Sequence, residues 1–372
     1  MPIPFSVFDG HGRLLLRSGT VISMPDQVER LMLRGARVPV NPDEKNLPDP
    51  GVRPSAAAPP PPEEKQPVFS QMEGLTLNLR HIFTTLLKSP EQIDLASRIR
   101  NLASNIQKLC EEDIDSALAA PYLDHQNPYI VVHHIMGAVL TDLIAAHKGL
   151  SPGDRLPYVC AALTRDIGQL SIQNQLEQSP SPLPEPLKKA LQNHPQLGVE
   201  LLKRAGVTDA NWLDCVLHHH ERLDGNGYPF KLTGEKLRLG PRILAISDIY
   251  SAMGRGRPYR TKAFFPQNAL REIYLTKDSH LDGELIQMLI KDIGILPPGS
   301  LVKLKCGEIA VVCKRTLKAD KATVFSVYNP RGMPVVDPVP RETQNPEFAI
   351  TGMVPFSECK SAAILIKRLW LK

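Results

Sequence analysis

The stretch HHHERLDGNGYP, residues 218–229, holds more chemistry than any other part of the chain. It places three histidines and two carboxylates beside a loop with two glycines and a proline. Neutral imidazole is the commonest protein ligand for metal ions, so neighbouring histidines are good candidates for ligands. The glycines permit a turn with positive φ, and Pro229 stiffens the exit from that turn. The stretch therefore predicts metal ligands next to a shaped loop.

Ligand-type side chains also interrupt apolar helical patterns outside this stretch. His133 follows an apolar run, Asp166 shares an apolar helical stripe, and His194 precedes a proline. Asp248 lies inside the run ILAISDI. A buried carboxylate without a partner is costly, so each aspartate needs a cation or several donors. Any one of these residues alone is more often a core, capping or salt-bridged side chain than a ligand, but their joint occurrence predicts a metal site.

Composition narrows the class of protein. The chain has 372 residues, enough for two or three domains, and its 42% hydrophobic and 22% charged residues are typical of globular proteins. A net charge of +5 is too small to predict DNA binding, but it suits a small anionic substrate. The six scattered cysteines do not predict a disulfide framework. We find no signal-peptide pattern and no run approaching 18 apolar residues, so we expect no membrane span and a cytoplasmic location.

The first part of the chain is predicted to be a small α+β module followed by a linker. Residues 5–22 alternate around Asp-Gly-His-Gly, which indicates a hairpin within a module of residues 1–40. Residues 25–33 favour a short helix. Residues 41–69 are rich in proline, with four in succession, which predicts a stiff and extended linker.

The rest of the chain is predicted to be helical and then β-rich. Residues 70–118 show apolar residues at helical spacing and form a helical lead-in. Residues 119–297 stay helical without strand alternation, and Pro195 is expected to open one of these helices. Residues 298–372 alternate around glycine and are expected to form a small β-rich domain. The predicted fold is therefore mainly α, an all-helical core with one small module at each end.

With these residues, the chain resembles the HD-GYP family, a branch of the HD-domain metal-dependent phosphohydrolases. The resemblance covers about residues 120–297, and the long string from the paired histidines to Gly-Tyr-Pro is its most specific part. The segments that carry it are His133, Asp166-Ile167-Gly168, His194-Pro195, residues 219–229, Asp248 and the Arg-Pro-Tyr-Arg of residues 257–260.

The resemblance implies an all-helical HD-type domain with a di- or trinuclear iron or manganese site. It implies hydrolysis of cyclic di-GMP in bacterial signal transduction. Two divalent ions can bridge a phosphodiester, lower the pKa of a bound water and neutralise charge on the phosphate oxygens. Asp166 would bridge two ions and act as the catalytic carboxylate. By family position the metal ligands would be His133, Asp166, His194, His219, His220 and Asp248.

Other residues would contact the substrate by the same resemblance. Arg257 and Arg260 would hold phosphate with their guanidinium groups, although a solvated loop would explain them equally well. Gly227, Tyr228 and Pro229 would bind substrate or dock a signalling-protein partner. For Tyr228, simple packing within the loop is an equal alternative.

Two positions depart from the family pattern. Arg165-Asp166 stands where the family has His-Asp, and Gln169 stands where it has a lysine. An arginine cannot ligate a metal and keeps its charge. A guanidinium near a divalent ion would repel it, so we expect reduced metal occupancy and weak or absent hydrolysis. Alternatively, Arg165 would turn outward and contact a phosphate.

These departures leave three functions open. The first is a cyclic di-GMP phosphodiesterase that tolerates Arg165. The second is a non-catalytic module that senses cyclic di-GMP or docks on a signalling partner. The third is a structural adaptor in which residues 1–40 and 300–372 are the working parts, and the retained ligand residues argue against it.

Overall fold

The computed structural model describes residues 7–8, 14–16, 19–20, 31, 65–179, 182–254, 265–316 and 322–371. The chain divides into two compact units, residues 1–64 and residues 65–372. In the first unit, β1 (Val7–Phe8) pairs with β2 (Leu14–Leu16) in antiparallel fashion, which agrees with the predicted hairpin. The helix predicted at residues 25–33 lies almost entirely outside the described residues.

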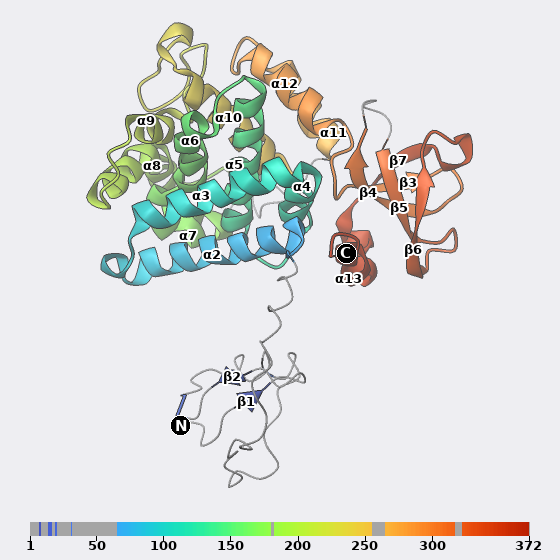
Figure 1. Cartoon of the computed structure of the whole chain (residues 1–372). Helices are drawn as coiled ribbons and strands as arrows, with labels where there is room; N and C mark the ends of the chain where they lie inside the picture. The colour runs from blue at the N-terminus through green and yellow to red at the C-terminus, as the bar shows by residue number, and fades with distance from the viewer. Residues whose placement is uncertain are drawn as a thin grey trace. The chain divides into compact units, whose positions relative to one another are not determined.

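Three helices open the second unit (Figure 1): α2 (Val68–Lys88), α3 (Leu95–Glu112) and α4 (Ile114–Leu123). Each of α2 and α3 buries one stripe of apolar residues at spacings of three and four, as an amphipathic helix does. Aspartates cap α3 and α4 by accepting backbone N–H groups of the first turn. The predicted lead-in of residues 70–118 is helical; its first helix begins two residues before the predicted start, and α4 continues past its predicted end.

Helix α5 (Tyr129–His147) runs through the centre of the helical part. It packs against α3, α6 (Pro152–Thr164) and α10 (Leu239–Met253), so it is apolar on almost every side. Among the described residues, α5 alone is long and apolar enough to cross a membrane, but 83% of its apolar window is buried within the protein. This burial is typical of a core helix.

The chain stays helical to Ile293, as predicted. The remaining helices are η2 (Ile167–Ile172), α7 (Gln173–Gln178), α8 (Glu185–Arg204), α9 (Ala210–His218), η3 (Gly234–Lys236), α11 (Pro266–Leu275) and α12 (Gly283–Ile293).

The prediction that Pro195 opens a helix is wrong. Pro195 lies inside α8, which begins ten residues earlier at Glu185. Pro186 already occupies the first turn, where proline costs no hydrogen bond, so this earlier proline is the one that starts the helix.

The C-terminal part is an antiparallel five-stranded sheet in the order β6-β5-β4-β3-β7. Its strands are β3 (Leu301–Leu304), β4 (Ile309–Arg315), β5 (Ala322–Tyr328), β6 (Pro334–Glu342) and β7 (Ile350–Val354). One face encloses a small apolar core of its own, and the other joins the main helical core through residues such as Val311. The short helix α13 (Ala363–Arg368) and Trp370 also pack on the main core. The predicted β-rich region is confirmed, and it shares one core with the helices.

Candidate metal centre

The six residues predicted as ligands converge from five places in the helical domain. His133 lies on α5, Asp166 follows α6, and His194 is in the middle of α8. The pair His219-His220 follows α9, and Asp248 is on α10. The structure arranges these residues in two groups that share one carboxylate: Asp166, His194, His219 and His220 form the four-donor group, and His133, Asp166 and Asp248 form the three-donor group.

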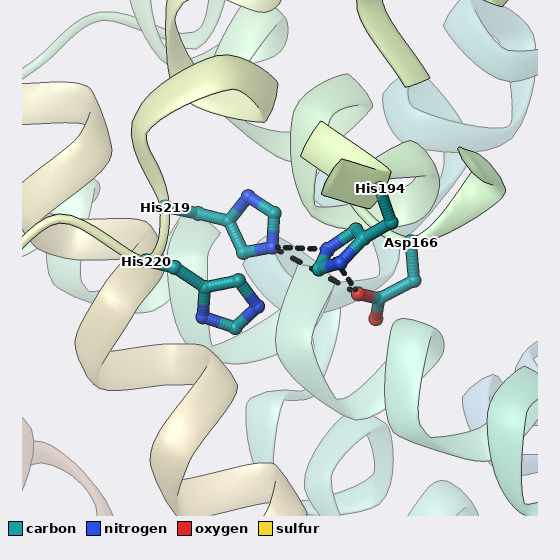
Figure 2. Close-up of side chains that lie close together, drawn as sticks. All are labelled: Asp166, His194, His219 and His220. Carbon is teal, nitrogen blue, oxygen red and sulfur yellow. Dashed lines mark hydrogen bonds and ion pairs between the residues drawn. The ribbon is translucent and has the colours of Figure 1, made fainter. Parts of the chain in front are cut away.

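In the four-donor group, the ligand atoms face one another across a small space (Figure 2). His194 Nε2 lies 3.3 Å from Asp166 Oδ1 and 3.2 Å from His219 Nε2. His219 Nε2 lies 3.8 Å from the same carboxylate oxygen. Ligand atoms at tetrahedral angles around a zinc-like ion, with bonds of about 2.0–2.1 Å, are separated by about 3.3 Å. The spacing of these atoms therefore fits one divalent ion.

Pro195 orients the His194 ring. A proline has no N–H, so the carbonyl of Leu191, four residues earlier, lacks its usual helical partner. His194 Nδ1 donates to that carbonyl instead. The bond fixes the ring and directs Nε2 toward Asp166 Oδ1, which lies 3.3 Å away.

Two further imidazoles are held in the same tautomer. His219 Nδ1 donates to the carbonyl of Val216 at 2.8 Å. His133 Nδ1 lies 3.0 Å from Ser251 Oγ, and this hydroxyl donates to the carbonyl of Ser247, so it accepts from the ring. In both rings Nε2 then faces the carboxylates of the site, with His133 Nε2 at 3.0 Å from Asp248 Oδ1 and His219 Nε2 at 3.8 Å from Asp166 Oδ1. The Nε2 atoms of His194 and His219 face one another at 3.2 Å in a buried space, which is an arrangement that two histidine ligands of one metal ion would have.

The charge states of the site suit metal binding. Burial, and then the charge of Arg165, lower the pKa of His133 to about 4. Burial and the neighbouring His219 hold the pKa of His220 well below its usual value. Burial would raise the pKa of Asp166, but His194, His219 and then Arg165 outweigh it and lower that pKa. Neutral imidazoles and an ionised carboxylate are the ligand forms that divalent ions require.

Arg165 lies inside the three-donor group. Its side chain is fully buried, and Nε donates to Asp248 Oδ1 at 2.8 Å and lies 3.6 Å from Asp166 Oδ2. Nη1 donates to the carbonyl of Ala162, and Nη2 to that of His133. The alternative in which Arg165 turns outward to a phosphate is therefore wrong, because its donors are committed to acceptors inside the protein.

Glycines allow the close approaches around this centre. A Cβ at Gly168 would lie 2.2 Å from the carbonyl oxygen of His194, so only glycine lets η2 pack directly on α8. A Cβ at Gly137, on α5, would lie 2.7 Å from Nη1 of Arg165. The first contact brings Asp166 to His194, and the second leaves room for the guanidinium group.

The structure also places His134, which we did not predict as a site residue, beside the shared carboxylate. His134 is fully buried, and its Nε2 lies 3.4 Å from Asp166 Oδ2. Burial, and then Arg165, lower its pKa to about 3. Its position next to His133 was the available signal, but adjacent residues on a helix point about 100° apart, so the sequence favoured only one of them.

The loop of residues 221–232 folds around Glu221. Both carboxylate oxygens of Glu221 accept backbone N–H groups, from Phe230 at 2.6 Å and from Leu232 at 2.9 Å. Gly227 lies against the Glu221 backbone, where a Cβ would be 2.4 Å from Cα. The Tyr228 ring packs on His220 with ring centroids 4.7 Å apart.

A cavity of about 120 Å³ opens beside both groups. Tyr228 lines it, whereas Gly227 and Pro229 do not. Gln169 also lines it, at the position where the resemblance would place a lysine. Arg257 and Arg260 lie outside the described residues. The described cavity wall otherwise comes from Tyr129, His133, Asp166, Gln173, Leu176, Leu191, His220 and Asp248.

Comparison with known proteins finds similar domains. Residues 121–285 match the family model described as HD domain. The chain is 32% identical over 216 residues to the cyclic di-GMP phosphodiesterase PA4108 of Pseudomonas aeruginosa, covering 57% of this chain and 51% of that protein. It is 32% identical to the 3'3'-cGAMP-specific phosphodiesterase 3 of Vibrio cholerae, covering 55% of this chain and 45% of that protein. The chain thus spans about half the length of these curated relatives.

A solved structure shares the fold. The HDG"Y"P protein Bd1817 from Bdellovibrio bacteriovorus superposes with a TM-score of 0.50 at 13% identity, covering 78% of this chain and 94% of that one. The helical core thus matches the HD domain over residues 121–285. The family model matches the helical part of the chain, and the relatives that this part resembles are named as cyclic dinucleotide phosphodiesterases.

Proposed function

We propose that the helical domain is a cyclic di-GMP phosphodiesterase of the HD-GYP type with slow turnover. The four-donor group around Asp166 carries this proposal, because its spacing, tautomers and charge states suit a divalent ion. The relatives named as cyclic di-GMP phosphodiesterases support the substrate. Histidine nitrogens and carboxylate oxygens without thiolates favour iron or manganese as the metal.

A metal ion bound there would polarise a phosphoryl oxygen and lower the pKa of a bound water. The chain's own residues would hold and orient the substrate. The cavity beside the ligand groups would take a phosphodiester of the substrate. Tyr228 would then restrict where that phosphodiester lies, since it packs on His220 and lines the cavity.

A second candidate function is binding of cyclic di-GMP without hydrolysis. The buried ion pair between Arg165 and Asp248 favours it, because hydrolysis by two metal ions needs both attacking and leaving oxygens to be clamped. Docking of a signalling partner on residues 227–229 would use the half-exposed Phe230 ring that follows them.

The test is metal content and cyclic di-GMP turnover, measured on the same anaerobically purified protein. We expect metal, binding of cyclic di-GMP, and turnover well below that of relatives with an intact His-Asp pair. His219→Ala should remove metal and binding together. His218→Ala is the matched control, because the adjacent His218 bonds Asp214, belongs to neither ligand group and should leave both properties unchanged. A wild-type protein with neither metal nor cyclic di-GMP binding would refute the proposed function.

A further inference from the structure

The three-donor group already contains a positive charge. Arg165 Nε lies 2.8 Å from Asp248 Oδ1, and His133 Nε2 lies 3.0 Å from the same oxygen. An ion ligated by that oxygen at about 2.0–2.2 Å would be within about 5 Å of Arg165 Nε. The guanidinium is fully buried, so little solvent would screen the repulsion between these two cations.

We propose that Arg165 is a built-in cation that takes the place of a metal ion among His133, Asp166 and Asp248. The ion-binding capacity of the site is then confined to the four-donor group. This inference rests on the proposed function, because it concerns the same site, and it explains the slow turnover in structural terms.

The guanidinium is held in place as a structural group would be. Three of its nitrogens donate to Asp248, to the carbonyl of Ala162 and to that of His133. Gly137 provides the space, since a Cβ there would meet Nη1 at 2.7 Å and the central carbon of the guanidinium at 3.2 Å. The surrounding residues therefore provide both the acceptors and the space that the guanidinium group needs.

Arg165 also has no route to the substrate. Its side chain is fully buried and does not line the described cavity, whereas Asp166 and Asp248 do. It can therefore neutralise these carboxylates but cannot contact a phosphate. Arg165 is therefore a positioning residue in this site. A phosphate in the cavity would contact one bound metal ion, whereas a site with two metal ions would offer both of them to the phosphate.

The first experiment compares metal content in wild type and Arg165→His, purified anaerobically with saturating Mn²⁺. We expect the variant to hold one more ion per chain, because the change removes the cation and adds a ligand. Equal metal content in the two proteins would overturn the inference. That result is distinct from failure of the proposed function, which is read on the wild type alone as loss of metal and cyclic di-GMP binding.

A second variant covers the case in which Arg165→His does not fold. Arg165→Met removes the charge and leaves two buried carboxylates facing one another, so its melting temperature should fall and Mn²⁺ should restore most of the loss. Arg155→Met is the matched control, because Arg155 is also buried and bonds Asp142 at 2.6 Å, and neither residue belongs to the two ligand groups. Mn²⁺ should raise the melting temperature of this control no more than it raises that of the wild type, because both keep only the four-donor group as an ion site. A failure of Mn²⁺ to rescue Arg165→Met would count against the inference.

Discussion

Pro195 influences the metal centre through the hydrogen bond that it cannot make. Its missing N–H leaves the carbonyl of Leu191 free, and His194 Nδ1 uses that carbonyl to fix its tautomer. The His194-Pro195 pair, which in the sequence resembles a helix start, thus orients a metal-ligand candidate. A proline inside α8 destabilises the helix, and the hydrogen bond from His194 to the Leu191 carbonyl offsets part of that loss. Helix propensities of single residues do not include this effect.

Pro195→Ala should weaken metal binding. The alanine N–H would compete for the Leu191 carbonyl, and loss of a partner that orients a ligand typically costs about 10–100-fold in metal affinity. Titration with Mn²⁺ measures the change. Pro157→Ala, at a proline inside α6 that does not line the site, should bind the metal as tightly as wild type does. Equal affinity in Pro195→Ala and wild type would show that the proline does not act on His194.

At the scale of elements, a buried side chain of the loop after α9 holds that loop in its conformation. Glu221 is buried, and it accepts two backbone N–H groups of the loop rather than pointing at the metal centre. It therefore fixes the turn that places Tyr228 on His220. The carboxylate next to the two histidines is a structural support for the loop and not a ligand.

Glu221→Gln should destabilise this loop. The amide has one acceptor oxygen, so one of the N–H groups of Phe230 and Leu232 would lose its partner, at a cost of about 1–3 kcal/mol in the free energy of unfolding. Chemical denaturation measures it. The same change at the exposed Glu235, in η3, should have no measurable effect. A fully stable Glu221→Gln protein would argue that the loop is held by other contacts.

At the scale of the whole described unit, the two ends of residues 65–372 meet. Phe69, at the start of α2, stacks on Trp370 with ring centroids 5.5 Å apart. Lys367 Nζ lies 2.6 Å from Glu73 Oε1 in the same contact. The sheet thus packs on the helices through a shared core, and the boundaries that we expected near residues 118 and 297 fall inside one compact unit.

Trp370→Ala should therefore destabilise the helices as well as the sheet. Truncating a large buried aromatic side chain costs about 3–5 kcal/mol, and a single unfolding transition is expected from a shared core. Circular dichroism at wavelengths for helix and for aromatic side chains should give coincident, lowered transitions. Leu371→Ala, at the neighbouring half-exposed position, is the control and should change little. Separate transitions for helix and aromatic signals would mean that the sheet folds independently.

Much of the fold and of the ligand set could be predicted because the signals are local. Apolar spacing gave the helices of residues 68–293, and alternation around glycines gave the β-rich end. The residue types and their order gave a set of ligand candidates, which the structure gathers into two groups around Asp166. The position of Arg257 and Arg260 lies outside the described residues, and their proposed role as phosphate ligands stays a prediction.

The sequence by itself determined the helical class, the order of the ligand residues and the replacement of a family histidine by Arg165. Only the tertiary structure decided where that arginine points, which acceptors hold it, and that His134 joins the site. The reason is physical. A ligand type is a property of one residue, whereas a guanidinium between two carboxylates depends on α5, α6 and α10 meeting, and on a missing Cβ at Gly137.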